Sequence, residues 1–286
     1  MGSRLAAIAT AFDNVYSGWI LWNLFLAFVP MLLSFWLFRP RAIPRRWFQI
    51  ACGLVGAIGV IGLWPRMSRI PGGWGRTLGD AMTGDAGALL RLSWLLLVVA
   101  VVLGLWRWGL NPNHTRQPWL WWLGVVVFMA FLPNAPYVLT DIIHLIRGAR
   151  AGEIPTWVIA LVFVPIHITA IVLGFEAYVV SILNLAYYLK QQGAKAWILP
   201  MELTIHALSA IGIYLGRFIR FNSWDLVTDP LDVLTDTLNI LTSKRPLAVI
   251  VVTFIILTVF YWLLKQITLG LKLRLHYARQ GIDALG

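Results

Sequence analysis

Two groups of polar and charged residues interrupt a chain that is otherwise strongly apolar, one in segment 131–145 and one in segment 212–225. Each group falls at the end of a hydrophobic stretch. Ionisable side chains are costly in contact with lipid, so those found there are candidates for function. We expect both stretches to end at the same membrane face, so that the two groups form one site. The candidate residues are Asn134, Tyr137, Asp141, His144, Arg217, Arg220, Asn222 and Asp225.

The first group contains a possible acid and base. Pro133 and Pro136 each remove a backbone donor and disfavour helix in the preceding residue, so the helix should break near Asn134. If helix resumes after Pro136, Asp141 and His144 share one face and form a candidate catalytic pair. The same two groups could supply half of a metal site, although we assign no metal. The alternative is an interfacial turn whose polar residues cap helix ends and face water.

The second group supplies cations. Arg217 and Arg220 lie three residues apart, and on a helix their guanidinium groups form a fork suited to phosphate or carboxylate. Alternatively, these arginines pair with Asp141 or Asp225, or extend to lipid headgroups. Both interpretations can hold together. The predicted ligand-binding residues are Asn134, Tyr137, Arg217, Arg220, Asn222 and Asp225.

The composition indicates that these groups are held by membrane-spanning helices. Of the 286 residues, 59% are hydrophobic and 12% charged, which excludes an ordinary soluble domain. The formal net charge is +11, but the basic residues lie in short segments between apolar stretches, so we expect membrane lipids rather than nucleic acid as partners. The single cysteine, Cys52, excludes an intrachain disulfide. The sequence leaves any cofactor unknown.

The apolar stretches predict an all-α fold, a polytopic transmembrane helix bundle that forms a single domain over residues 1–286. A bilayer core of about 30 Å needs about 20 helical residues. About seven stretches approach that length: 17–38, 47–64, 89–107, 119–139, 156–180, 197–217 and 246–264. The second stretch carries Gly53, Gly56, Gly59 and Gly62, a small-residue ridge that predicts close helix packing.

Two connecting segments have their own predicted character. Segment 65–88 is rich in glycine, lacks a nucleotide-binding pattern, and is expected to be an outer loop. Segment 226–243, before the last span, has leucine and aspartate residues on opposite helical stripes. It predicts an amphipathic helix lying on the membrane surface.

The loop between the first two spans predicts the orientation. It contains Arg39, Arg41, Arg45 and Arg46, and clustered arginines favour the cytoplasmic side. With seven spans, the N-terminus then lies outside, the C-terminus lies in the cytoplasm, and the candidate site faces outwards.

The two polar segments also resemble a known family. LPNAPYxxTDxxHL within 131–145 and GIYLGRFxRxNSWD at 212–225 are similar to the bacterial integral membrane family called domain of unknown function 1361. The resemblance implies a multi-span protein of the bacterial inner membrane whose activity is unassigned. The positions that match are Asn134, Pro136, Tyr137, Asp141, His144, Gly216, Arg217, Arg220, Asn222 and Asp225.

Three functions follow as hypotheses. The first is an outward-facing polar pocket that binds an anionic lipid or headgroup-like ligand, with chemical transformation of that ligand left open. The second is a transporter or ion pathway that uses the intramembrane residues Glu176, Glu202 and His206, with His167 as a further buried candidate. The third is a structural or assembly protein whose polar groups hold helices together.

Overall fold

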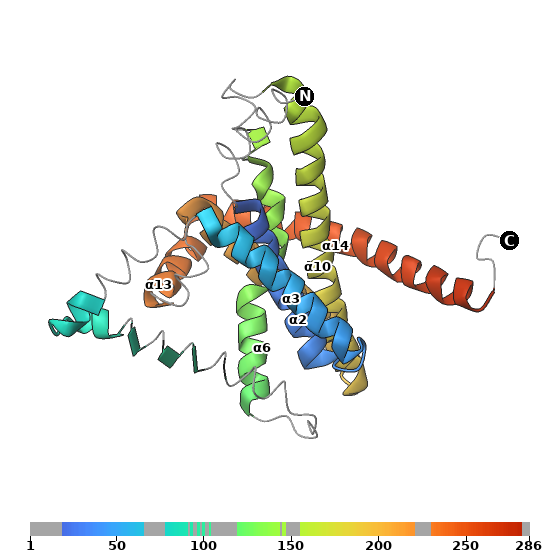
Figure 1. Ribbon diagram of the computed structural model, residues 1–286, viewed down its shortest axis with the longest axis horizontal. Coiled ribbons are helices and arrows are strands. Elements are labelled where there is room, and N and C mark those ends of the chain that lie inside the picture. Colours follow the sequence, from blue (N-terminus) through green and yellow to red (C-terminus); the bar gives the residue numbers. More distant parts are fainter. Residues whose placement is uncertain are drawn as a thin grey trace.

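The computed structural model (Figure 1) is a bundle of helices. It describes residues 19–65, 78–90, 92–93, 96–97, 99–100, 103, 119–143, 145–146, 155–220 and 230–281. No strand occurs among these residues, which confirms the predicted all-α fold class.

The main described elements follow the apolar stretches of the sequence. In chain order they are α2 (Trp19–Phe38), α3 (Arg45–Leu63), α6 (Trp119–Phe131), α7 (Asn134–Tyr137), η2 (Val138–Asp141), α9 (Thr156–Val158), η3 (Ile159–Phe163), α10 (Val164–Gln191), η4 (Lys195–Trp197), α11 (Ile198–Tyr214), η5 (Leu215–Ile219), α13 (Pro230–Leu241) and α14 (Lys244–Arg279). Elements η2 and η4 are 3₁₀ helices, whereas η3 and η5 are π-helices.

Six helical stretches of the described chain are long and apolar enough to cross a membrane. They are Trp19–Phe38, Arg45–Leu63, Trp119–Asp141, Thr156–Gln191, Lys195–Ile219 and Lys244–Arg279. Each overlaps a predicted span. The remaining predicted span, 89–107, lies largely outside the described residues, and those of its residues that are described are helical. The chain is therefore a multi-pass helical membrane protein.

Helices α2 and α10 form the centre of the bundle and run in the same direction. Trp19 contacts His167 near the start of both helices, with ring centroids 5.8 Å apart. Phe38 contacts Tyr188 near their ends, at 5.7 Å. Helix α6 runs the opposite way, because its first turn contacts the end of α2 through a hydrogen bond from the Trp121 indole to the carbonyl of residue 37, 3.1 Å long.

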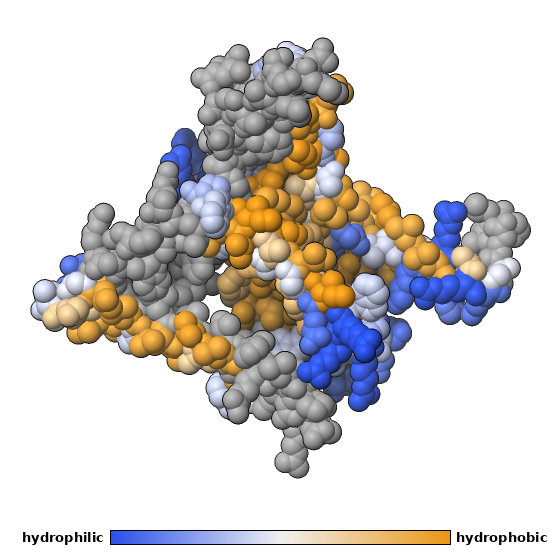
Figure 2. All heavy atoms as spheres, in the orientation of Figure 1, coloured by the Kyte–Doolittle hydropathy of each residue, from blue (hydrophilic) through white to orange (hydrophobic). Residues whose placement is uncertain are grey.

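The outer faces of the helices are apolar, as expected for contact with lipid. Helix α3 buries only three of its 19 residues, Val55, Gly59 and Gly62. Its side chains Leu54 and Val60 are 62% and 64% exposed. Figure 2 shows hydrophobic residues over much of the visible surface. A surface of this kind marks membrane contact rather than water contact.

The glycine ridge of α3 packs on α2 at two of its four positions. A Cβ atom at Gly62 would lie 2.5 Å from the backbone nitrogen of Trp22, and one at Gly59 would lie 2.7 Å from the Phe25 ring. At Gly53 and Gly56 nothing lies within 4 Å. The prediction of close packing is therefore confirmed for the C-terminal half of the ridge.

We expect Gly62→Ala to destabilise the protein by about 1–3 kcal/mol, because the added methyl group overpacks against backbone that cannot move aside alone. The matched change Gly56→Ala places its methyl group in open space and gains up to about 1 kcal/mol of helix propensity. Thermal unfolding of the two purified variants in one detergent measures the difference. A lower midpoint for Gly56→Ala than for Gly62→Ala contradicts this packing.

The two connecting segments differ in part from expectation. Residues 66–77 of the predicted loop 65–88 lie outside the described residues, but residues 78–82 and 86–90 are helical, which corrects a loop assignment there. The helical residues 86–90 follow Asp85, whose carboxylate accepts a hydrogen bond of 2.6 Å from the Ala88 amide and so caps the start of the helix. The high glycine content of the segment gave no indication of this cap. Helix α13 covers residues 230–241 of the predicted amphipathic helix 226–243, and its Leu231, Leu234 and Leu238 are exposed.

Candidate functional site

The candidate site begins at the break in the fourth predicted span. Helix α6 ends at Phe131, Leu132 and Pro133 form a turn, and the short α7 begins at Asn134, so the predicted break is confirmed. The Asn134 amide donates a hydrogen bond of 3.0 Å to the carbonyl of Phe131. This bond satisfies a carbonyl that the end of α6 leaves free. Asn134 therefore acts here at a helix end.

Two glycines bring α11 and η5 against this broken segment. A Cβ atom at Gly212 would lie 2.8 Å from the Pro133 side chain, and one at Gly216 would lie 2.9 Å from the Tyr137 ring. The Tyr137 hydroxyl points at the Gly216 carbonyl, at 3.5 Å. Only glycine permits this approach, because any side chain at these positions would occupy the same space.

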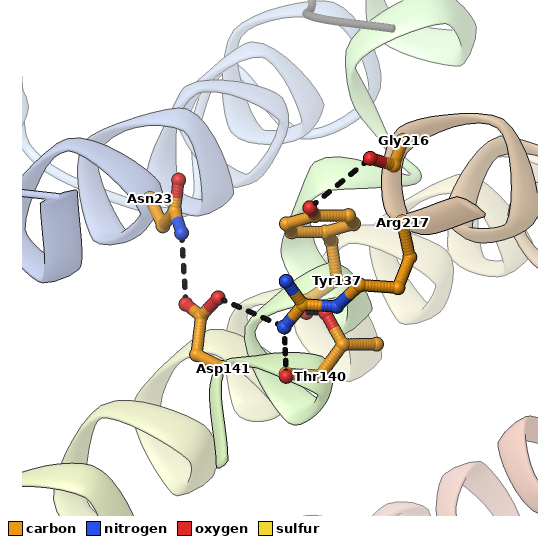
Figure 3. A network of polar contacts seen from close by, with 6 residues as sticks. All are labelled: Asn23, Tyr137, Thr140, Asp141, Gly216 and Arg217. Atoms are coloured by element: carbon orange, nitrogen blue, oxygen red, sulfur yellow. Dashed lines mark hydrogen bonds and ion pairs between the residues drawn. The ribbon is translucent and has the colours of Figure 1, made fainter. Parts of the chain in front are cut away.

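Asp141, at the end of η2, is the most deeply buried ionisable group of the site. Asp141 is 1% exposed. The Asn23 amide of α2 donates a hydrogen bond of 2.8 Å to Oδ2 (Figure 3). Oδ1 receives no hydrogen bond from the described residues, and the nearest cation, Nη2 of Arg217, stands 3.8 Å away. One carboxylate oxygen thus accepts a hydrogen bond, and the other accepts none from the described residues.

Arg217, on the π-helix η5, covers Asp141 from the other side. Its Nη2 donates a hydrogen bond to the Thr140 carbonyl, and its guanidinium carbon lies 5.5 Å from the centre of the Tyr137 ring. Figure 3 shows the guanidinium between that ring and Asp141. The side chain is 21% exposed. The guanidinium is therefore held in place by these contacts, on a side chain that stays partly accessible.

This arrangement can bind an anion. A guanidinium presents five donors in a rigid plane, and carbonyl and aromatic contacts fix that plane here. The low polarity of the surroundings strengthens each charge interaction. Among the described residues, no group of three or more histidine, cysteine, aspartate or glutamate side chains could hold a metal ion.

The remaining predicted site residues lie apart or outside the described chain. Arg220 follows the π-helix in the left-handed conformation, with φ 68°, and its side chain is exposed. The helix has ended there, so Arg217 and Arg220 do not share a helical face, and the predicted fork is corrected. His144, Asn222 and Asp225 lie outside the described residues. A catalytic pair of Asp141 with His144 accordingly stays a prediction.

Sequence reasoning missed two groups that complete the site. Asn23 bonds Asp141 across 118 positions of sequence, and Thr140 supplies the carbonyl acceptor for Arg217. The sequence does contain an indication for Asn23, because it is the lone amide side chain in the apolar run Trp19–Phe38. An isolated polar residue in a span is by default a functional or packing candidate.

A second polar cluster joins α11 to α14. Lys265 and Tyr261 both donate hydrogen bonds to Oε1 of Glu202, at 2.6 and 2.7 Å. Glu202 is 7% exposed. The intramembrane carboxylate predicted as a transport candidate is thus held by an ion pair.

The same polar layer continues towards α10. The Tyr178 hydroxyl lies 2.8 Å from Nδ1 of His206 and 3.2 Å from the Ser209 hydroxyl. The rings of His206 and Tyr261 are 4.7 Å apart, so the two clusters touch. His167 belongs to another neighbourhood, where its Nδ1 lies 2.7 Å from the Phe163 carbonyl.

The fold and surface define the class of protein, a multi-pass helical membrane protein with buried polar clusters. The chain belongs to the family described as protein of unknown function (DUF1361), whose model matches residues 90–259, more than half of the chain. This match confirms the resemblance and includes every predicted site residue, but not Asn23. No curated protein and no solved structure matches the chain.

Proposed function

We propose that Tyr137, Asp141 and Arg217 form a binding site for an anionic lipid headgroup or a headgroup-like molecule. The observation that carries the proposal is the unsatisfied Oδ1 of Asp141, which lies 3.8 Å from the guanidinium of Arg217, a side chain that is partly exposed. Burying a carboxylate oxygen without a donor is costly. A site in this state is ready to accept a donor from outside.

The geometry distinguishes this site from a saturated ion pair. An arginine and carboxylate pair frequently forms two short parallel hydrogen bonds. Here Nη2 donates its bond to the Thr140 carbonyl and stands beyond hydrogen-bond distance of Asp141. An anionic oxygen can therefore bind the exposed part of the guanidinium while a ligand hydroxyl donates to Oδ1. Phosphate esters with a free hydroxyl, such as glycerol phosphate, offer both groups.

The proposed site faces the outside of a bacterial inner membrane. Asn23 lies near the start of α2, and the basic loop after Phe38 lies at its other end. The positive-inside tendency favours the cytoplasm for that loop and the outside for the site. Arg220, Asn222 and Asp225 follow Arg217 directly in sequence and are proposed to extend the site. Transformation of the ligand is proposed to need Asp141 with His144.

The test is binding of glycerol 1-phosphate to the purified full-length chain in detergent, measured by isothermal titration calorimetry. Arg217→Gln should weaken binding at least about tenfold, since a hydrogen bond to a charged group contributes about 1.5–3 kcal/mol. Arg274→Gln removes the same charge from α14 and should leave the affinity unchanged. Equal affinities for all three proteins contradict the proposal.

A comparison of ligands tests the role of Asp141 without relying on a disruptive variant. Methyl phosphate keeps the anion and lacks the free hydroxyls, so the wild-type protein should bind it more weakly than glycerol phosphate. In Asp141→Asn that difference should shrink, because the amide replaces a pure acceptor. An unchanged preference contradicts the assigned role of Oδ1.

A transporter is the second candidate, favoured by the buried polar layer of Glu202, Lys265, His206 and Tyr178. Such groups inside a membrane commonly mark ion or substrate pathways. Flux into proteoliposomes that survives Glu202→Gln and His206→Ala removes these residues from any pathway. Flux that either variant abolishes supports this candidate.

A further inference from the structure

The last third of α14 extends away from the other described helices (Figure 1). Residues 266–279 add about 21 Å of helix at about 1.5 Å per residue. Leu269, Leu271, Leu273 and Leu275 in this segment are all exposed, at 41% to 61%. Figure 2 shows hydrophilic residues beside hydrophobic ones at this end of α14. The segment is therefore both basic and apolar.

A groove of about 400 Å³ lies where this segment leaves α10. Its wall on α10 is Glu176. On α14 it is lined by Thr268, Lys272, His276 and Arg279 and by two leucines, Leu271 and Leu275. The groove thus combines cations with an apolar floor.

Three basic side chains of the groove share one helical face. Lys272, His276 and Arg279 follow the spacing i, i+4, i+7, which keeps them on one stripe of an α-helix. Arg274 lies two residues after Lys272 and points to the opposite side, and it does not line the groove. The chain therefore offers a matched control for position.

The one acid of the groove does not cancel this charge. The Glu176 carboxylate accepts a hydrogen bond of 2.7 Å from the Thr268 hydroxyl at the inner end. Arg279 lies eleven residues further, about 16 Å along the helix axis. The ion pairs of the described residues are those of Asp141 and Glu202, so neither Lys272 nor Arg279 is neutralised within this part of the chain.

We infer that this groove binds an anionic phospholipid, with the phosphate between Lys272, His276 and Arg279 and acyl carbons on Leu271 and Leu275. Basic pockets between membrane helices favour anionic headgroups, and charge selects them over zwitterionic lipids. The groove shares no residue with the proposed Arg217 site.

The experiment is a native mass spectrometry titration of the purified full-length chain with dioleoyl phosphatidylglycerol and, separately, dioleoyl phosphatidylethanolamine. It is run on wild-type protein and in an Arg217→Gln background, which removes lipid bound at the proposed outer site. We expect tighter binding of phosphatidylglycerol in both backgrounds. Lys272→Gln and Arg279→Gln should each weaken it by about fivefold, whereas Arg274→Gln should change it less than about twofold.

Three results overturn the inference. Equal weakening by Arg274→Gln indicates diffuse attraction to surface charge rather than a groove. Unchanged binding in Lys272→Gln and Arg279→Gln removes the groove from lipid recognition. Phosphatidylethanolamine bound as tightly as phosphatidylglycerol shows that charge is not recognised. Failure of Arg217→Gln to affect glycerol phosphate leaves this inference standing, so the two proposals fail separately.

Discussion

Replacing Lys265 by methionine is expected to lower the free energy of unfolding by about 3–5 kcal/mol. The methionine keeps the apolar stem but removes the ammonium group that donates 2.6 Å to Glu202. Glu202 is 7% exposed, and among the described residues its carboxylate keeps only the Tyr261 hydroxyl as a hydrogen-bond donor. An uncompensated buried charge between α11 and α14 costs far more than an exposed ion pair contributes.

Thermal and denaturant unfolding in one detergent measure the effect. Lys272→Met, two turns further along α14, removes the same charge without an ion-pair partner among the described residues and should shift stability by less than about 0.5 kcal/mol. Adding Glu202→Gln to Lys265→Met should restore most of the loss, because the carboxylate is then gone. Equal losses for Lys265→Met and Lys272→Met contradict the ion pair.

Asn23→Leu is the second variant with a large expected effect, about 3 kcal/mol of destabilisation. Asn23 provides the hydrogen bond of 2.8 Å to Oδ2 of Asp141, and the other carboxylate oxygen already lacks one. Leaving a buried charged group without donors costs about 1–3 kcal/mol or more. Because the two residues are 118 positions apart, the loss should loosen α2 from η2.

A double replacement separates desolvation from packing. Asn23→Leu with Asp141→Leu removes both polar partners and should recover most of the stability, since paired apolar groups of similar shape are nearly neutral. Unfolding midpoints of the single and double variants measure the coupling. If the double variant is as unstable as Asn23→Leu alone, the hydrogen bond is not the cause.

The same double variant distinguishes a ligand site from an assembly element. Under the proposed function it folds and no longer binds glycerol phosphate. Wholesale unfolding of every variant at Asn23, Asp141 and Arg217, together with no detectable ligand binding by the wild-type protein, supports the structural alternative instead.

Local patterns predicted the spans and the helix break, because both depend on neighbours in sequence. A sufficiently long apolar run predicts a span, and the closely spaced Pro133 and Pro136 predict a break, although the single Pro30 is accommodated inside α2. The helix that contains the last predicted span, 246–264, continues to Arg279 as α14. Its lysine at 265 is neutralised by Glu202 rather than ending the helix, and the residues that follow are mostly good helix formers.

The site was only partly predictable because its geometry depends on contacts distant in sequence. Asp141 and Arg217 were expected to meet, and the structure brings them to 3.8 Å. The part played by Asn23 depends on how α2 lies along η2, which no spacing reveals. The placement of Arg220 depends on a π-helix followed by a left-handed residue. Residue spacing for a regular α-helix predicts neither the π-helix nor the left-handed residue.

The contact between Gly216 and the ring of Tyr137 has an evolutionary consequence. Since a methyl group at position 216 would lie 2.9 Å from the Tyr137 ring, the residue allowed at position 216 depends on the size of the residue at position 137. A relative with alanine or a larger residue at position 216 should carry a smaller residue in place of Tyr137. Covariation of positions 137 and 216 across homologous sequences therefore indicates the same helix crossing and can be measured without another structure.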